Sequence, residues 1–145
     1  MGIRQRPATP WHFWVVGILA LLFYGGGSYY YLMMQSNNEA YLASYTARQL
    51  AYFDNAPTWF DAAWAIGVWV PLLGALLFLI RNRFAFYALL LGLVGFAVAS
   101  FYQFSGTAPS SMTTGAGLAS TAIIGALQLI FVLYAGAMLR RSVLR

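Results

Sequence analysis

The chain has 145 residues, of which 61% are hydrophobic and only 8% are charged, and its mean hydropathy is +0.69. A soluble domain of this length would have too little polar surface to cover itself, so the composition excludes an ordinary water-soluble protein. The net charge of +5 arises from eight basic and three acidic residues, and the absence of cysteine excludes disulfides, thiolate nucleophiles and cysteine-ligated metals.

Four long stretches of the chain contain no Lys, Arg or Glu, and Asp61 is the only carboxylate within them. At about 1.5 Å per residue, each stretch is long enough to cross the roughly 30 Å hydrocarbon core of a bilayer as a helix. We therefore predict one all-α domain over residues 1–145, an integral membrane bundle of four transmembrane helices with a short interfacial helix in the first outer loop. The predicted spans are residues 13–34, 59–80, 84–104 and 116–139.

The first span follows two arginines, as the apolar core of a signal peptide does. Its apolar part continues to Met34 without an Ala-x-Ala cleavage site and exceeds the usual core of about 7 to 15 residues, so we interpret it as a retained span. His12, the only histidine, lies at the start of this span. A single histidine does not allow paired haem ligands or a histidine-rich metal site within one chain. We interpret His12 as an interfacial polar residue, with an axial ligand to a pigment or metal as the alternative.

Three consecutive glycines, Gly25, Gly26 and Gly27, interrupt the outer part of the first span. Each weakens a helix by about 1 kcal/mol relative to alanine, so this part of the helix should be deformable. We predict that the glycines make close contacts with another helix, a lipid tail or a partner subunit.

Polar and aromatic residues gather near the predicted outer ends of the helices. Tyr29 and Tyr30 follow the glycines, and Tyr102 and Gln103 end the third span. We interpret them as an ordinary aromatic belt at the membrane surface. The alternative is an outward-facing pocket, which they would line together with the glycines and the tyrosines of the first outer loop.

The first connection carries a helical pattern. Ser36 and Glu39 have the spacing of a capping box, and from Glu39 to Phe53 the apolar and aromatic residues recur every three or four positions, with Gln49 as a polar interruption. This pattern predicts one helix lying in the outer interface, and a partly ordered loop is the alternative.

The second span begins near Thr58, because Pro57 breaks the chain and Thr58 with Asp61 repeats the cap pattern. Asp61 is interpreted as a capping residue, with a proton or cation relay as the alternative. Pro71 removes a backbone donor and should kink this helix.

Residues 81–83 leave room only for a tight turn, so the second and third spans should form an antiparallel hairpin. Residues 105–115 are rich in Ser, Thr and Gly and are predicted to form a flexible outer loop. Gln128 lies near the middle of the fourth span and should find a hydrogen-bond partner on another helix, with ligand binding as the alternative. Small residues that favour close helix packing recur at intervals of three or four in three spans: Ala63, Gly67, Pro71 and Ala75; Ala88, Gly92, Gly95 and Ala99; Gly115, Ala119, Ala122 and Ala126.

Arginines flank the spans in a pattern that gives the topology. Because the number of spans is even, the arginine-bearing segments share one face, and short arginine-rich segments stay in the cytoplasm. We predict a multi-pass protein of the bacterial inner membrane with both termini cytoplasmic, and anionic lipid headgroups as partners of the arginines. The arginines are split among three short segments, which disfavours nucleic acid. The predicted topology anchors are Arg4, Arg6, Arg81, Arg83, Arg140 and Arg141.

The stretch from Tyr52 to Arg83 resembles small four-span bacterial inner-membrane proteins that are labelled sugar-transporter-like. The resemblance covers mainly the second and third spans. It implies the same membrane fold, and it carries no catalytic or binding residue over. The glycine and tyrosine run of the first span departs from that group. The motifs that carry the resemblance are Pro57-Thr58-Trp59, Ala65-Ile66-Gly67-Val68-Trp69, Gly74 and Arg81-Asn82-Arg83-Phe84-Ala85.

Three functional hypotheses follow. The favoured one is a non-enzymatic accessory or helper subunit that packs against a larger membrane complex or against itself, without a cofactor. The second is a small oligomeric transporter or permease for a neutral solute, although no buried acid or base is available for ion coupling. The third, a membrane enzyme acting on lipid or isoprenoid substrates, is disfavoured because the chain has no Lys, no Cys and one His.

Overall fold

The computed structural model describes residues 5–145, so Arg4 lies outside the described residues. Within this part the chain is all-α, with seven α-helices, one π-helical turn and no strand. In chain order the elements are α1 (Trp11–Gln35), α2 (Glu39–Leu42), α3 (Ala47–Asp54), α4 (Thr58–Leu79), α5 (Phe84–Tyr102), η1 (Gln103–Thr107), α6 (Ser110–Thr113) and α7 (Gly115–Arg140).

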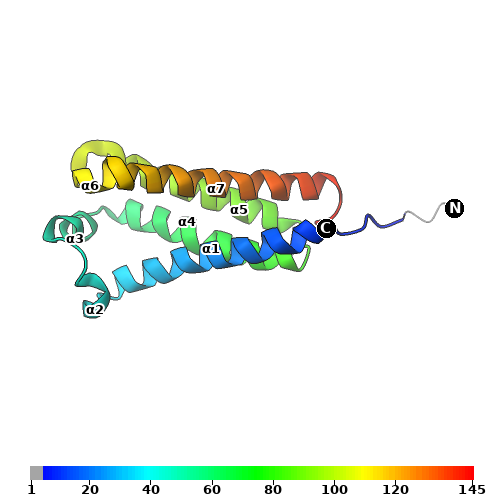
Figure 1. Cartoon of the computed structure of the whole chain (residues 1–145), viewed down its shortest axis with the longest axis horizontal. Coiled ribbons are helices and arrows are strands. Elements are labelled where there is room, and N and C mark those ends of the chain that lie inside the picture. The colour runs from blue at the N-terminus through cyan, green and yellow to red at the C-terminus, as the bar shows by residue number, and fades with distance from the viewer. Residues whose placement is uncertain (1–4) are drawn as a thin grey trace.

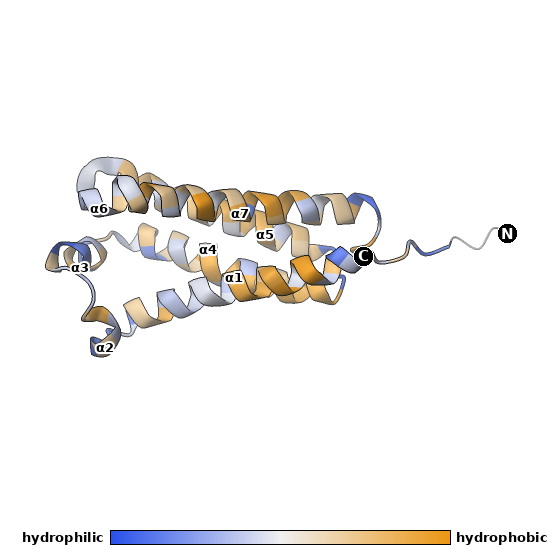
Figure 2. Cartoon of the chain, in the orientation of Figure 1, coloured by the Kyte–Doolittle hydropathy of each residue, from blue (hydrophilic) through white to orange (hydrophobic). Residues whose placement is uncertain are grey.

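Four helices of the described part are long and apolar enough to cross a membrane, namely α1, α4, α7, and α5 extended by η1. They run side by side as an elongated bundle (Figure 1), and apolar residues dominate along their length (Figure 2). The ends of the four helices fall within three residues of the predicted spans, so the prediction of an all-α bundle with four membrane spans is confirmed.

The two ends of the bundle differ in composition. We call the end formed by α2, α3 and α6 the loop end, and the opposite end, with Arg6, the turn at residues 81–83 and residues 140–145, the arginine end (Figure 1). Apart from Arg48 of α3, the arginines that the structure describes therefore share one end of the bundle, as an even number of spans requires.

Helices α4 and α5 form the predicted tight hairpin, and small residues bring their backbones together. A Cβ atom on Gly95 would lie 2.7 Å from the carbonyl oxygen of Ala63, which is closer than real side chains approach. Pro71 is buried within α4, which continues through it, and its ring fills the space that Gly92 leaves by having no side chain. The predicted packing of the small residues of these two spans is confirmed.

The small-residue row predicted for α7 is wrong. Its four members, residues 115, 119, 122 and 126, are all exposed. Helix α7 instead turns Gly125 and Gly136 toward α5, where an added Cβ would lie 3.0 Å from the ring of Phe96 and 3.2 Å from that of Phe86. The two glycines accommodate phenylalanine rings rather than a helix backbone, and a pattern of small residues does not reveal this difference.

The single interfacial helix predicted over residues 39–53 is wrong in its continuity, because the chain bends between α2 and α3. The side chain of Asn38 caps α2 by accepting from the backbone N–H of Tyr41 at 3.0 Å. Thr46 and Gln49 form a capping box that starts α3, at 3.2 and 3.0 Å. Gln49 is therefore the second half of a cap and not an interruption of one helix.

Two other predicted caps are also wrong. Ser36 ends α1 instead of starting α2: its backbone N–H donates to the carbonyl of Leu32 at 2.9 Å, and Asn37 follows with a φ of 53°. Thr58 is the first residue of α4, so it makes no side-chain cap, and Pro57 holds the N-cap position. Asp61 remains in the first turn of α4, where a negative charge stabilises the helix dipole.

The arginine end holds the main hydrophobic core. The rings of Phe13 and Phe78 stack at a centroid distance of 4.2 Å, and Val143 and Leu144 fold back into the same cluster. Backbone bonds tie this tail to the α4–α5 turn, because the N–H of Arg145 donates to the carbonyl of Arg81 at 2.8 Å. This half of the bundle is closed by side chains from all four long helices.

Candidate ligand pocket toward the loop end

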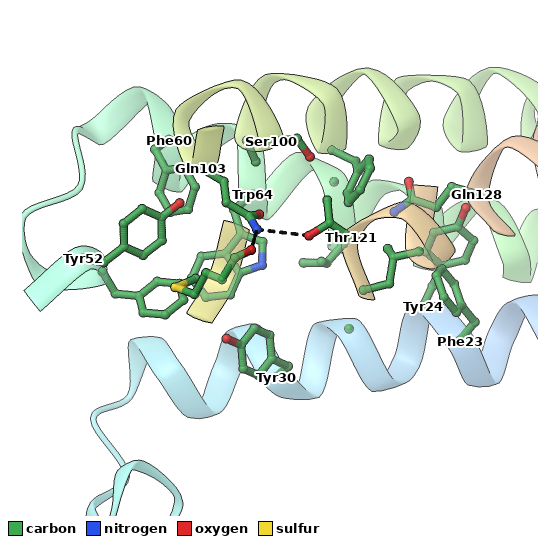
Figure 3. Close-up of a pocket in the computed structure, with 18 residues that line it drawn as sticks. Phe23, Tyr24, Tyr30, Tyr52, Phe60, Trp64, Ser100, Gln103, Thr121 and Gln128 are labelled. Atoms are coloured by element: carbon green, nitrogen blue, oxygen red, sulfur yellow. Dashed lines mark hydrogen bonds between the residues drawn. The ribbon is translucent and has the colours of Figure 1, made fainter. Parts of the chain in front are cut away.

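A pocket of about 380 Å³ lies within the other half of the bundle, between mid-depth and the loop end (Figure 3). All four long helices contribute to it, and α3, η1 and α6 add residues at the loop end. It is lined by Phe23, Tyr24, Gly27, Tyr30, Tyr52, Phe53, Phe60, Trp64, Gly67, Val68, Phe96, Ala99, Ser100, Gln103, Met112, Thr121, Ile124 and Gln128.

The pocket exists because α1 and α7 do not pack backbone to backbone. Helix α4 lies against α1 and α5, and α7 packs on α5, so α1 and α7 face each other across the bundle. Aromatic side chains bridge this distance at mid-depth, where the ring of Phe131 lies 5.6 Å from that of Phe23 and 5.9 Å from that of Tyr24. Beyond these rings, toward the loop end, the space stays open.

Aromatic rings form most of the pocket wall. Eight of the 18 lining residues are Phe, Tyr or Trp. At the loop end Tyr52 of α3 stacks on Tyr102 at 5.2 Å, and Phe60 lies 4.8 Å from the same ring. These contacts hold the short helix α3 over the loop end of the pocket.

Burial raises the pKa of Tyr52 above its ordinary value, and the neighbouring Tyr102 hydroxyl adds to this shift. The phenol is 5% exposed and stays neutral over the whole physiological range. Tyr52 therefore adds no charge to the loop end of the pocket.

The deep end of the pocket holds two buried polar groups without partners. Gln128 is 4% exposed and Tyr24 is 2% exposed. Neither the Gln128 Oε1 atom nor the Tyr24 hydroxyl has a hydrogen-bond partner among residues 5–145. Figure 3 shows the two side chains together at the end of the pocket opposite Tyr52. We expected Gln128 to bond to another helix, but its Oε1 has no partner among the described residues. A buried acceptor without a partner lowers the stability of the fold by about 1 to 3 kcal/mol.

Gln103 forms hydrogen bonds to two other elements at the loop end of the pocket. Its Nε2 donates to the carbonyl of Met112 at 2.6 Å and to the hydroxyl of Thr121 at 3.0 Å (Figure 3). These bonds join η1, α6 and α7 at the pocket wall. The connection that was predicted to be a flexible loop is therefore structured, with a turn at Gly106, where φ is 101°, and the short helix α6.

The three glycines of α1 have different surroundings. Gly27 lines the pocket, and a Cβ on it would lie 3.5 Å from Val68 of α4. A Cβ on Gly25 or Gly26 would have no atom of the described chain within 4 Å, apart from the glycines' own helix backbone and chain neighbours. The close α1–α4 contact comes instead from Ser28, whose hydroxyl donates to the carbonyl of Val68 at 3.1 Å. Gly25 and Gly26 therefore make no close contact with another helix of the described chain, and their surface is open to a lipid tail or a partner subunit.

The two tyrosines that follow the glycines point to different places. Tyr30 lines the pocket, with its ring 5.6 Å from that of Trp64. Tyr29 is 57% exposed and meets only the Tyr41 ring, at 6.2 Å, among the aromatic contacts of the described chain. The structure thus brings Gly27, Tyr30, Gln103 and Gln128 into one pocket and leaves Gly25, Gly26 and Tyr29 outside it.

His12 and Asp61 lie away from the pocket. A hydrogen bond joins His12 Nδ1 to the hydroxyl of Tyr134, which links α1 to α7 at the arginine end. Asp61 accepts from Gln35 Nε2 at 3.3 Å, which links the end of α1 to the start of α4. Within residues 5–145 no three His, Cys, Asp or Glu side chains come together as metal ligands would.

A second, more polar cavity of about 430 Å³ lies at the arginine end. Arg6, Arg141 and Arg145 line it, together with Gln5, Pro7 and Ser142. Arg81 has a different role, because its Nε donates to the carbonyl of Val143 at 3.2 Å within the fold. The predicted topology anchors therefore include one residue that also stabilises the tail.

Reasoning from the sequence missed Tyr24, Trp64 and Phe96. For Tyr24 a signal exists, because Ala20, Tyr24 and Ser28 recur every four residues and share the buried face of α1. Comparison of the chain with protein-family models, curated proteins and solved structures found no match.

Proposed function

We propose that this chain is a non-enzymatic helper protein of a bacterial inner membrane that holds a small neutral molecule in the pocket. The observation that carries the proposal is a cavity of about 380 Å³ with aromatic walls and buried polar atoms that lack partners among the described residues. Sites for small molecules have this character, with a volume of roughly 300 to 1,000 Å³, mostly apolar walls and a few placed polar groups.

The charge distribution supports an orientation with both termini in the cytoplasm. The arginine end carries Arg6, Arg83, Arg140 and Arg141, whereas the loop end carries all three carboxylates and one arginine, Arg48. Because short basic segments stay in the cytoplasm, the loop end faces outward in this proposal, and the pocket lies in the outer half of the membrane. The cavity lined by arginines is then placed to meet anionic headgroups.

The pocket supplies binding groups and few reactive ones. Its polar side chains are hydroxyls and amides, and none of the 18 lining residues is charged or is a histidine. Ser100 and Thr121 therefore have no general base beside them that would activate a hydroxyl. This composition supports a binding role over catalysis on lipid or isoprenoid substrates.

The exposed side of α1 supports association with another membrane protein. Gly25 and Gly26 leave the helix backbone open to close approach, as small residues do at helix interfaces in membranes. A helper of this kind would hold its ligand in the pocket while this side of α1 contacts a larger complex or a second copy.

A small transporter for a neutral solute is the second candidate, because the pocket reaches mid-depth of the bundle. The path onward to the arginine end is filled by Tyr24, Phe131 and the stack of Phe13 on Phe78. Passage would require these buried rings to move apart, whereas binding requires no such movement. The resemblance to sugar-transporter-like proteins is compatible with both candidates and stays a prediction.

The function can be tested with two adjacent substitutions in α1. Gly27→Leu places a side chain in the pocket, and Gly26→Leu adds the same side chain outside it, with the same gain in helix propensity. Tagged copies are purified in mild detergent, and bound small molecules are extracted and compared by mass spectrometry. We expect a compound that is present in the wild type and in Gly26→Leu and is missing from Gly27→Leu.

Identical extracts from all three proteins would contradict the binding function. The same preparations test the helper role, since a stoichiometric partner should be retained by Gly27→Leu and weakened by Gly26→Leu. A clean homo-oligomer whose stability is unaffected by Gly26→Leu would contradict association through this side of α1.

A further inference from the structure

The lining of the pocket selects against charged ligands. None of the 18 residues around it is ionised at neutral pH, and its walls are aromatic, aliphatic, hydroxyl or amide groups. Transfer of a carboxylate or ammonium into such a space is strongly unfavourable without an opposite charge. The ligand is therefore neutral.

The deep end of the pocket selects one kind of polar group. Gln128 Oε1 can only accept a hydrogen bond, whereas the Tyr24 hydroxyl both donates and accepts. A ligand hydroxyl that reaches both atoms, once the two side chains turn toward the pocket, satisfies both, because it donates to Gln128 and accepts from Tyr24. A carbonyl or an ether accepts only, so it would leave the Gln128 oxygen unmet.

The volume and the lining of the pocket determine which carbon skeleton the ligand can have. A volume of about 380 Å³ is near the lower limit for small-molecule sites. Phe96, Trp64 and Tyr30 are among the eight aromatic residues that line the pocket, and aromatic rings favour contact with another ring. A compact ring system fits within this space, whereas a long-chain lipid would have to extend beyond it.

We propose that the ligand is a compact, neutral, ring-bearing alcohol or phenol whose hydroxyl binds between Gln128 and Tyr24 at mid-depth. Its ring system lies among the aromatic side chains on the side toward the loop end. This inference rests on the proposed binding function and adds the chemical class of the ligand.

Four naphthalenes test the class, because they share one ring system and differ in the polar group. 2-Naphthol donates and accepts, 2-methoxynaphthalene only accepts, naphthalene does neither, and 2-naphthoate is charged. Uptake of each into lipid nanodiscs that contain the full chain is measured by equilibrium dialysis, with empty nanodiscs as the blank. We expect 2-naphthol to bind about tenfold more tightly than 2-methoxynaphthalene, because only the former satisfies the Gln128 oxygen.

Substitutions at the deep end should remove this preference. Gln128→Leu and Tyr24→Phe keep the approximate volume of each side chain and remove the polar atom, so 2-naphthol should bind them no better than 2-methoxynaphthalene. Tyr87→Phe is the matched control for the phenol, because Tyr87 is 56% exposed on α5 and lies outside the pocket. Gln35→Leu on the exposed end of α1 is the control for the amide. Both controls should keep the tenfold preference, and retained naphthalene uptake shows that each variant is folded.

The outcomes separate the ligand class from the function. If all four naphthalenes bind equally and Gly27→Leu abolishes their uptake, the pocket binds small molecules and the hydroxyl class is wrong. If no uptake exceeds that of empty nanodiscs and Gly27→Leu changes nothing, the binding function is wrong as well. Displacement of 2-naphthol by a diacylglycerol, which carries a hydroxyl on two long chains, would overturn the compact-ring part of the proposal.

Discussion

The α-carbon of Gly67 in α4 stands 3.1 Å from the position that a Cβ on Gly95 of α5 would occupy. Two helix backbones therefore touch at this point without any intervening side chain. In a bilayer, where apolar surfaces gain little by leaving lipid, such close contact is a main source of helix association. It makes the α4–α5 hairpin the tightest helix pair of the bundle.

Gly95→Ala should destabilise the protein, because its methyl group would collide with backbone atoms that cannot rotate away. We expect a loss of about 1 to 3 kcal/mol in the free energy of unfolding, measured by titration with sodium dodecyl sulfate. Gly26→Ala is the control, since its methyl group meets open space, and it should be neutral or stabilising through helix propensity. Equal stability of the two variants would contradict the backbone contact.

The bond between His12 and Tyr134 should couple α1 to α7. In a double-mutant cycle with His12→Phe and Tyr134→Phe, we expect a coupling free energy of about 0.6 to 2 kcal/mol, as found for hydrogen bonds between membrane helices. The same cycle with Tyr87→Phe should give no coupling, because Tyr87 is exposed on α5 and makes no bond to His12. A value near zero for the His12–Tyr134 pair would show that the bond contributes no stability.

Alkaline pH should destabilise the loop end through Tyr52. Its pKa is raised in the folded state, so the neutral phenol contributes stability in full below about pH 10, and this contribution is lost as the pH rises further. Tyr52→Phe should therefore lose less stability than the wild type between about pH 9 and 11, in thermal unfolding followed by circular dichroism. Parallel losses in the two proteins would mean that Tyr52 titrates normally.

Cysteine labelling tests the orientation directly, because the chain contains no cysteine. Asn82→Cys lies in the α4–α5 turn at the arginine end, and Ala43→Cys lies at the loop end after α2. An impermeant maleimide added to intact spheroplasts should label Ala43→Cys and spare Asn82→Cys, and permeabilisation should expose both. The reverse pattern in intact spheroplasts would invert the proposed topology.

The ends of the long helices were predictable because lipid and water impose opposite requirements on the chain. Apolar residues continue for the length of a span and stop at polar or charged residues, so Thr58 and Arg83 mark boundaries that the structure reproduces to within a residue. Local capping was less predictable. Ser36 and Glu39 have the spacing of a cap, but Ser36 is used to end α1, and the pattern does not say which of two adjoining helices takes the residue.

The pocket was predictable only in part. Gln103, Gln128 and Tyr30 were singled out as polar or aromatic residues within or beside apolar segments, and each of them lines it. Nothing in the local pattern distinguishes Tyr30 from Tyr29, yet one faces the pocket and the other is exposed. The difference depends on the rotation of α1 about its axis, which is determined by Ser28 against Val68 and by the aromatic rings at mid-depth.

The sequence by itself determined that this chain crosses a membrane four times with seven of its eight arginines in segments that belong to one side, because the lengths of apolar segments and the placement of charge are local properties of the chain. Only the tertiary structure decided that α1 and α7 stand apart toward the loop end. It also decided that Gln128 Oε1 and the Tyr24 hydroxyl, more than a hundred positions apart in the chain, lie at the deep end of one pocket without a hydrogen-bond partner among residues 5–145. That arrangement arises from which side chains fill the space between helices. Large aromatic rings hold α1 and α7 apart, whereas glycines let α4 and α5 touch.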